Sequence, residues 1–279
     1  MKGSAHARWR TGLMLAPALS TVAVLFGGAL VGAVEQSVQP PLGGGISTWS
    51  WTSWSALFAD PEFTDALWFS ARVTALATLI SAALALVVAG PLRRAGSAAR
   101  SLFVLPVPVP HLIVAASAVL WLGPGGLADR ALGSLPVDLV RDPAGIGIVL
   151  VYVYKETPFL VLLVLAAAGR SLQQREEAAA VLGASPWQRL RWVVWPGVRG
   201  PLSIGSLIVA AFVFGAFEVP LAVGPNYPST IAVYAYEATQ NDALSGNGRA
   251  AAALLIAAVV SLLAAVGVVR LARTGIARG

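Results

Sequence analysis

Cysteine is absent from this chain of 279 residues, and charged residues make up only 11% of it. The lack of cysteine excludes a disulfide framework, a thiolate metal site and a cysteine nucleophile. Soluble domains carry about 25% charged residues. The low charge, 57% apolar residues and a mean hydropathy of +0.76 therefore exclude an ordinary soluble domain and predict a chain that lies within a lipid bilayer.

Lysine and histidine are also scarce, since the only lysines are Lys2 and Lys155 and the only histidines are His6 and His111. Neither lysine lies in a G-x4-G-K-[ST] loop, which would cradle nucleotide phosphates. The sequence also lacks the H-E-x-x-H and G-x-S-x-G motifs of hydrolases. We therefore expect no enzymatic activity in this chain, no catalytic residue, no cofactor and no metal site.

Six stretches are apolar and long enough to cross a bilayer, which takes about 20 residues. They run approximately over residues 11–34, 67–90, 102–122, 145–168, 202–222 and 250–271. The first resembles a signal peptide in its basic flank, but its apolar run is long and no A-x-A cleavage site follows it. We therefore expect a retained helix and an all-α, polytopic membrane protein with about six transmembrane helices.

The formal charge of +6 is distributed unevenly between the two sides of these spans. Most arginines outside the spans fall on the side that holds both termini, whereas only Arg130, Arg141 and Arg249 fall on the other. Because cytoplasmic loops carry an excess of lysine and arginine, we expect both termini to be cytoplasmic in a plasma or inner membrane. The high pI then reflects membrane orientation, and we expect no nucleic-acid partner.

The segment between the fourth and fifth predicted spans, residues 170–201, begins with a sequence that favours a short helix. Residues 173–182 contain no helix breaker. Glu176 and Glu177 lie in the first turns, where the helix dipole favours negative charge. Gly183 follows and allows the backbone to turn at the end of a helix.

A second short helix is predicted directly after this turn. Ser185 can cap it and Pro186 suits its first position. Pro196 and Gly197 are expected to end it. The product is a helix-turn-helix outside the membrane that can transmit force from a moving partner, although its arginines also suit a segment that only binds anionic lipid.

The run Glu177-Ala178-Ala179, then Gly183, then Val193-x-Trp195-Pro196 resembles the E-A-A-x3-G-x9-I-x-L-P loop of permease subunits of ABC importers, the MetI-like family. Valine and tryptophan replace isoleucine and leucine here, and both remain apolar. The resemblance covers residues 67–271, preceded by a helix and loop (1–66) and followed by a cytoplasmic tail (272–279). The sequence around Gly183 looks more like polyamine, iron and sulfate permeases than sugar permeases.

The resemblance implies a docking site for a separate ATPase, formed by Glu176, Glu177, Ala178, Ala179, Gly183, Ala184, Ser185 and Pro196. It also implies a second permease subunit, homologous or identical, an extracytoplasmic substrate-binding protein, and a small solute as substrate, with polyamines first. ATP binding would then drive alternating access. The alternative is a secondary transporter or channel that acts alone, which inverted repeats would favour, and none is visible.

Polar residues in or beside the spans are candidates for the translocation path: Lys155, Glu156, Glu218, Asn226 and Tyr227. An unpaired charge at a helix centre costs about 2.5–3.5 kcal/mol on insertion scales. The structural alternative is that these charges neutralise one another and Arg72. If Glu218 lines the path, its carboxylate favours a cationic substrate.

The third span opens with three alternating prolines, Pro106, Pro108 and Pro110, followed by His111. Each proline lacks a backbone donor and clashes with the preceding turn of a helix. We therefore expect a bent entry that is buried in the bundle, with His111 as a structural hydrogen-bonding residue.

Overall fold

The computed structural model describes residues 3–39, 49–133, 138–242 and 246–276. These residues form helices and no strand. Six helical segments are long and apolar enough to cross a membrane, namely 14–37, 61–94, 111–132, 146–167, 186–215 and 246–273. The expected all-α polytopic fold is confirmed.

The chain divides into two compact units, of which the first comprises residues 1–60 and 235–256. It contains α1 (Gly3–Ser37), α2 (Thr52–Ala59), the end of α12 (Ile231–Asn241) and the beginning of α13 (Gly246–Ile276). The indole Nε1 of Trp54 donates to Ser37 Oγ at 3.2 Å and so joins α2 to α1. The guanidinium of Arg249 lies 2.8 Å from a carboxylate oxygen of Asp242 and 3.7 Å from one of Asp60.

The second unit comprises residues 61–234 and 257–279. Its helices are α3 (Pro61–Arg94), α4 (Ser97–Val104), α5 (His111–Leu122), α6 (Leu127–Leu132), α7 (Ile146–Ala167), α8 (Arg170–Val181), α9 (Pro186–Arg189), the π-helix η1 (Leu190–Val194), α10 (Trp195–Gly215) and α11 (Glu218–Val223). It also holds the start of α12 and the rest of α13.

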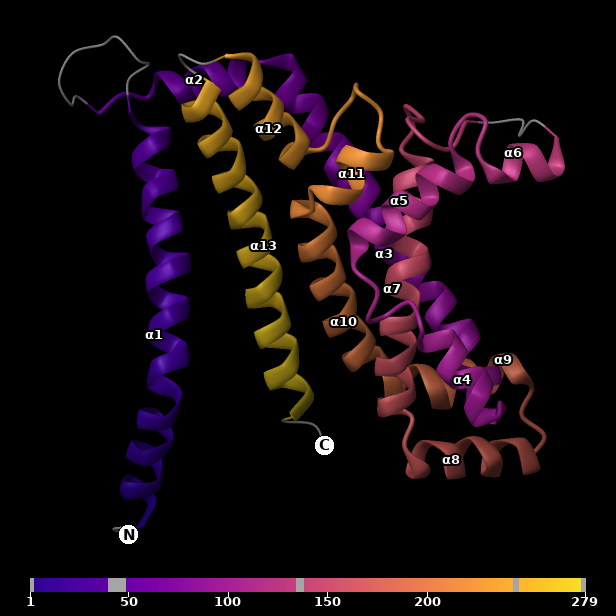
Figure 1. Cartoon of the computed structure of the whole chain (residues 1–279). Coiled ribbons are helices and arrows are strands. Elements are labelled where there is room, and N and C mark those ends of the chain that lie inside the picture. The colour runs from indigo at the N-terminus through magenta and orange to yellow at the C-terminus, as the bar shows by residue number, and fades with distance from the viewer. Residues whose placement is uncertain (1–2, 40–48, 134–137, 243–245, 277–279) are drawn as a thin grey trace. The chain divides into compact units, whose positions relative to one another are not determined.

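Helix α7 is the centre of the second unit and packs against α3 and α10 (Figure 1). Its side chains Tyr152, Leu160 and Val161 are fully buried. The share of buried residues is larger in α7 than in the other five spans, although Tyr154 and Leu150 leave one apolar face exposed. The other spans keep apolar faces exposed within this chain, as lipid-facing or partner-facing helices do.

The third predicted span, 102–122, is not one helix. Helix α4 ends at Val104, a turn follows, and α5 begins at His111. The prolines at 106, 108 and 110 account for the break, because a continuous helix would leave three ladder positions without a donor.

The predicted fifth span, 202–222, also differs from the structure. Helix α10 ends at Gly215, Ala216 has extended backbone angles, and Glu218 begins the separate helix α11. A continuous helix would place Pro220 in its interior, where the carbonyl of Ala216 would lose its donor. Glu218 therefore lies outside the span in which the sequence placed it.

The expectation that Pro196 and Gly197 end the second loop helix is wrong. The chain stays helical from Pro186 through η1 into α10. The N–H of Trp195 bonds to the carbonyl of Leu190 in the wide turn of η1, and Pro196 falls in the first turn of α10. Proline has no N–H to donate, and the wide turn of η1 directly precedes the position at which a regular helix would need that donor.

Candidate functional site

The first half of the coupling loop, as we name residues 170–201, ends in a complete glycine turn. Gly183 has a φ of +84°. Its N–H bonds to the carbonyl of Ala180 at 3.0 Å, and the N–H of Ala184 bonds to that of Ala179 at 3.0 Å. This pair of bonds is the Schellman motif, which satisfies the last carbonyls of α8 and reverses the chain.

The second half of the coupling loop begins with a reciprocal cap. Ser185 Oγ accepts a hydrogen bond from the N–H of Gln188 at 3.3 Å, and Gln188 Oε1 accepts one from the N–H of Ser185 at 2.8 Å. Pro186 fills the first position of α9. Two local motifs in succession therefore fix the angle between α8 and α9, as the sequence predicted.

The two predicted acidic residues of the loop have different surroundings. Glu176 is partly buried, and its Oε2 lies 2.9 Å from the guanidinium of Arg93 at the end of α3. Glu177 is exposed and accepts a hydrogen bond from Gln173 Nε2 at 2.9 Å. Glu176 thus ties the loop to α3, whereas Glu177 is available on the surface.

The small and turn-forming residues of the predicted docking site lie mostly on the surface. Ala178, Gly183, Ser185 and Pro196 are exposed, and Ala179 and Ala184 are partly buried. No atom lies within 4 Å of the position that a Cβ at Gly183 would take. The turn is thus open to a partner.

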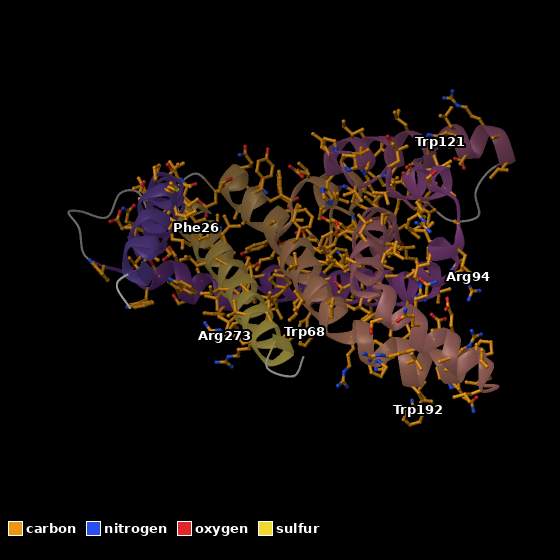
Figure 2. The ribbon with its side chains drawn as sticks, turned by 90° about the horizontal axis from the view of Figure 1, so that it is seen from below. Phe26, Trp68, Arg94, Trp121, Trp192 and Arg273 are labelled. Atoms are coloured by element: carbon orange, nitrogen blue, oxygen red, sulfur yellow. The ribbon has the colours of Figure 1, made fainter. Side chains whose placement is uncertain are left out.

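Large apolar side chains surround this turn, and the sequence analysis did not single them out. The exposed fractions are 88% for Val181, 86% for Leu182 and 66% for Trp187. Trp192, 70% exposed, projects away from the ribbon (Figure 2). Val181 and Leu182 lie outside the six candidate spans, where exposed apolar groups mark an interaction surface, whereas Trp187 and Trp192 lie near the start of the 186–215 segment. The signal available in the sequence was the apolar pair Val181 and Leu182 directly before the turn glycine.

Inside the second unit, the side chain of Lys155 on α7 is buried and engaged. Its Nζ donates to the carbonyl oxygens of Pro106 at 2.9 Å and Val107 at 2.7 Å. These carbonyls belong to the turn between α4 and α5. Lys155 therefore satisfies backbone that the proline-rich sequence leaves without helical partners.

Glu156, the next residue of α7, holds the other end of the same turn. Its Oε1 lies 2.9 Å from Nε2 of His111, and the His111 ring packs 4.7 Å from the ring of Phe212, centroid to centroid. His111 is thus the hydrogen-bonding residue that the sequence predicted. Arg72 donates to the carbonyl of Ala144 at 2.9 Å, so these charges are satisfied separately and do not neutralise one another as a group.

The three remaining path candidates are exposed, whereas Lys155 and Glu156 are buried. Glu218 begins α11, and Asn226 and Tyr227 lie in the loop before α12. The Tyr227 hydroxyl donates to a carboxylate oxygen of Asp65. That hydrogen bond is the main reason that the pKa of Tyr227 is raised. The five path candidates thus differ in exposure, and a shared role in a translocation path stays a prediction.

Tyr152 was missed by the sequence reasoning. It is fully buried, and its hydroxyl has no hydrogen-bond partner among the described residues. The available signal was its position on α7 one turn before Lys155 and Glu156, which places all three near one face.

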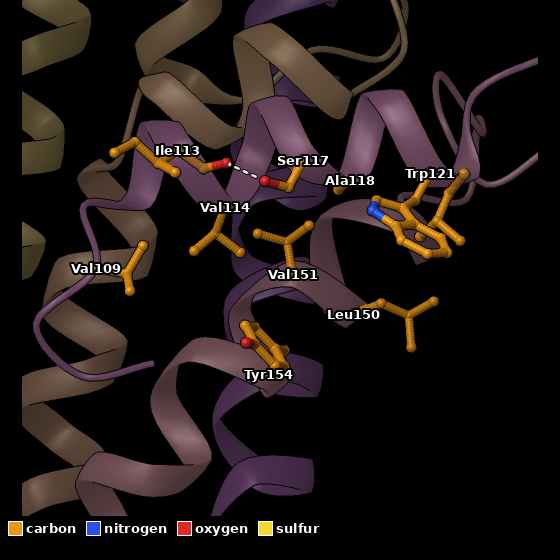
Figure 3. Close-up of a pocket in the computed structure, with 10 residues that line it drawn as sticks. Val109, Ile113, Val114, Ser117, Ala118, Trp121, Leu150, Val151 and Tyr154 are labelled. Carbon is orange, nitrogen blue, oxygen red and sulfur yellow. Dashed lines mark hydrogen bonds between the residues drawn. The ribbon is translucent and has the colours of Figure 1, made fainter. Parts of the chain in front are cut away.

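An apolar cavity of about 450 Å³ opens between α5 and α7. Trp121 and Tyr154 border it, and its one internal hydrogen bond joins Ser117 Oγ to the carbonyl of Ile113 (Figure 3). The described residues contain no cluster of histidine and acidic side chains suited to a metal ion. The second unit can therefore contact a solute through apolar side chains and a few fixed hydrogen-bonding groups.

Comparison with known proteins gives consistent matches. The family described as the binding-protein-dependent transport system inner membrane component matches residues 77–274. The inner membrane ABC transporter permease protein YnjC of Escherichia coli K12 is 31% identical over 239 residues, which are 84% of this chain and 45% of that protein. The chain thus spans less than half the length of YnjC.

Two other relatives are similar over much of the chain. The sulfate transport system permease protein CysW of Escherichia coli K12 is 25% identical over 73% of this chain and 72% of its own length. The thiamine transport system permease protein ThiP of Brucella abortus is 27% identical over 81% of this chain and 41% of its own length. A bacterial alginate ABC transporter, solved with an alginate-bound periplasmic protein, has the same fold, with a TM-score of 0.74, 20% identity and 93% coverage of each chain.

Proposed function

Because the chain belongs to the family of binding-protein-dependent transport system inner membrane components, the permeases of ABC importers, we propose that it forms half of a solute path driven by a separate ATPase. The family is one of transport permeases rather than enzymes. Its members act in the inner membrane as multi-pass proteins, in keeping with the six apolar helices.

The observation that carries this proposal is the construction of the coupling loop. Gly183 and Ser185 fix two helices at a set angle, and Val181 and Leu182 are left exposed beside the open turn. Such a rigid, partly apolar projection suits docking on a partner and transmission of its motion. In this proposal Glu177, Ala178 and Gly183 face the ATPase, and Glu176 acts as a positioning residue through Arg93.

The proposed assembly contains two ATPase subunits, a second permease and an extracytoplasmic binding protein. The exposed apolar faces of α5 and α7, including Trp121 and Tyr154, support a further membrane partner beside this chain. Both termini are proposed to be cytoplasmic, on the same side as the coupling loop. The single-cysteine variants Ser4→Cys and Gln240→Cys test this topology, because the chain has no cysteine of its own. A membrane-impermeant thiol reagent should label them from opposite sides of sealed vesicles.

We propose a small solute of the polyamine class as substrate. The exposed carboxylates of Glu218 and Asp65, on the side opposite the coupling loop in the proposed topology, support a cationic solute. In this proposal Lys155 and Glu156, which the sequence placed in the path, do not contact the solute. They stabilise the α4–α5 turn through Pro106, Val107 and His111. The test is uptake of labelled spermidine, sulfate and thiamine by cells that depend on this chain. Uptake of sulfate alone would contradict the polyamine proposal.

A further inference from the structure

A cavity of about 610 Å³ lies beside the coupling loop, where α3, α7 and η1 meet. Its lining follows α3 from Leu86 to Arg94, a distance of about 12 Å along a helix axis. The first part of this lining is apolar and falls within a membrane-spanning helix. Val164 of α7 and Val194 of η1 also belong to the apolar part, together with Ala168, Pro186 and Leu190.

The other end of the cavity is cationic. Arg93, Arg94 and Arg189 line it together with Glu176, whose carboxylate is already paired with Arg93 at 2.9 Å. An adjoining cavity of about 220 Å³ shares these four residues and adds Glu177, which is exposed and bonded to Gln173. The guanidinium groups therefore outnumber the carboxylates.

Two of these arginines have unused binding capacity. Arg94 and Arg189 form no ion pair among the described residues. The Nε of Arg189 is buried without a hydrogen-bond partner there, which is costly because a buried donor needs an acceptor. The side chain of Arg94 is exposed and projects outward from the ribbon (Figure 2). The polar end thus has the charge and the free donors to bind an anion.

We propose that this cavity binds one anionic phospholipid, with its phosphate at Arg94 and Arg189 and an acyl chain along Val87 and Val194. A free phosphate would leave the apolar end uncovered. A zwitterionic lipid would not match the surplus positive charge. Basic pockets between transmembrane helices at the cytoplasmic side bind acidic headgroups for the same reason. The lipid would link the end of α3 to α9 and so hold the coupling loop against the membrane.

The test is a titration of the purified full chain in detergent with dioleoyl phosphatidylglycerol or dioleoyl phosphatidylcholine, with bound lipid counted by native mass spectrometry. We expect one phosphatidylglycerol to bind preferentially. The double variant Arg94→Gln/Arg189→Gln should bind it roughly 25-fold more weakly, since each surface arginine contributes about fivefold to anionic-lipid affinity. If the double variant does not fold, Arg94→Gln alone should give the smaller, fivefold loss.

The matched control is Arg191→Gln/Arg199→Gln, which removes the same charge from exposed positions of the loop outside the cavity. It should leave affinity within about twofold. Gly90→Leu should fill the apolar end, because no atom lies within 4 Å of its Cβ position, and should weaken lipid binding. The proposal would be overturned if the control variant lost as much affinity for phosphatidylglycerol as the double variant. It would also be overturned if phosphatidylcholine bound equally well, or if glycerol phosphate displaced all the bound phosphatidylglycerol. None of these results depends on transport activity.

Discussion

The ammonium group of Lys155 lies 2.9 Å from the carbonyl oxygen of Pro106, although 49 positions separate the two residues. In a regular helix that carbonyl would accept the N–H of residue 110, which is a proline and has none. In the turn this carbonyl accepts the N–H of Val109 at 3.2 Å, and the ammonium group of Lys155 supplies a second donor. The bend between α4 and α5 and the central helix of the unit are therefore stabilised by the same contact.

Lys155→Met should destabilise the subunit by about 2 kcal/mol, because hydrogen bonds from a charged donor to buried carbonyls are lost. Thermal unfolding of the purified chain measures this. Lys155→Arg, which keeps the charge and donors, is the matched variant and should be affected less. A Lys155→Met protein with unchanged stability and no uptake would instead place Lys155 in the translocation path.

Gly183→Asp should abolish transport and leave the subunit in the membrane. The substitution costs about 1 kcal/mol because of the left-handed backbone, and it places a charge on the proposed docking surface. Gly169→Asp is the matched control, since Gly169 is also exposed with open space around its Cβ position but has a φ of −60°. Normal uptake by the Gly183 variant would count against the proposed role of the turn.

Arg93→Glu should loosen the coupling loop, because it leaves two carboxylates facing each other at the site of the present ion pair. We expect faster hydrogen exchange of the α8 amides and reduced uptake. The double variant Arg93→Glu/Glu176→Arg restores the pair and should recover both. Recovery of neither would show that Glu176 acts by direct contact with a partner rather than by positioning.

Glu218→Gln should leave membrane abundance unchanged, because Glu218 is exposed and begins a short helix rather than pairing with a buried cation. In the proposed function it lowers uptake of a cationic solute several-fold. Immunoblotting of membranes and uptake in the same cells separate the two effects. Depletion of the variant from the membrane would indicate a structural role instead.

The local motifs of the coupling loop were predictable because each depends on a few neighbouring residues. Gly183 required only a helix before it, and the capping role of Ser185 followed from the proline after it. The fate of Pro196 was not predictable in this way, since proline both ends helices and begins them. In the structure the π-turn at Leu190 carries the helix past Pro196 instead of ending it there. Such a turn has no sequence signature of its own.

The interior contacts were harder to predict because they join residues far apart in sequence. Lys155 and Glu156 were correctly identified as charges that need partners. Their partners, the carbonyl of Pro106 and the ring of His111, depend on how α5 packs against α7. Periodicity predicts which face of each helix is buried, but it does not predict how far one helix is shifted along the axis of the other. The sequence therefore allowed mutual neutralisation of the charges, whereas the packing gives each charge a different partner.

The most direct test of the central claim is uptake into proteoliposomes made from the complex that copurifies with a tag on this chain. With ATP supplied to the coupling-loop side, solute should accumulate, and a non-hydrolysable analogue should give none. The chain purified alone should neither hydrolyse ATP nor transport. Uptake by the chain alone, driven by an ion gradient without ATP, would contradict the account and identify a secondary transporter.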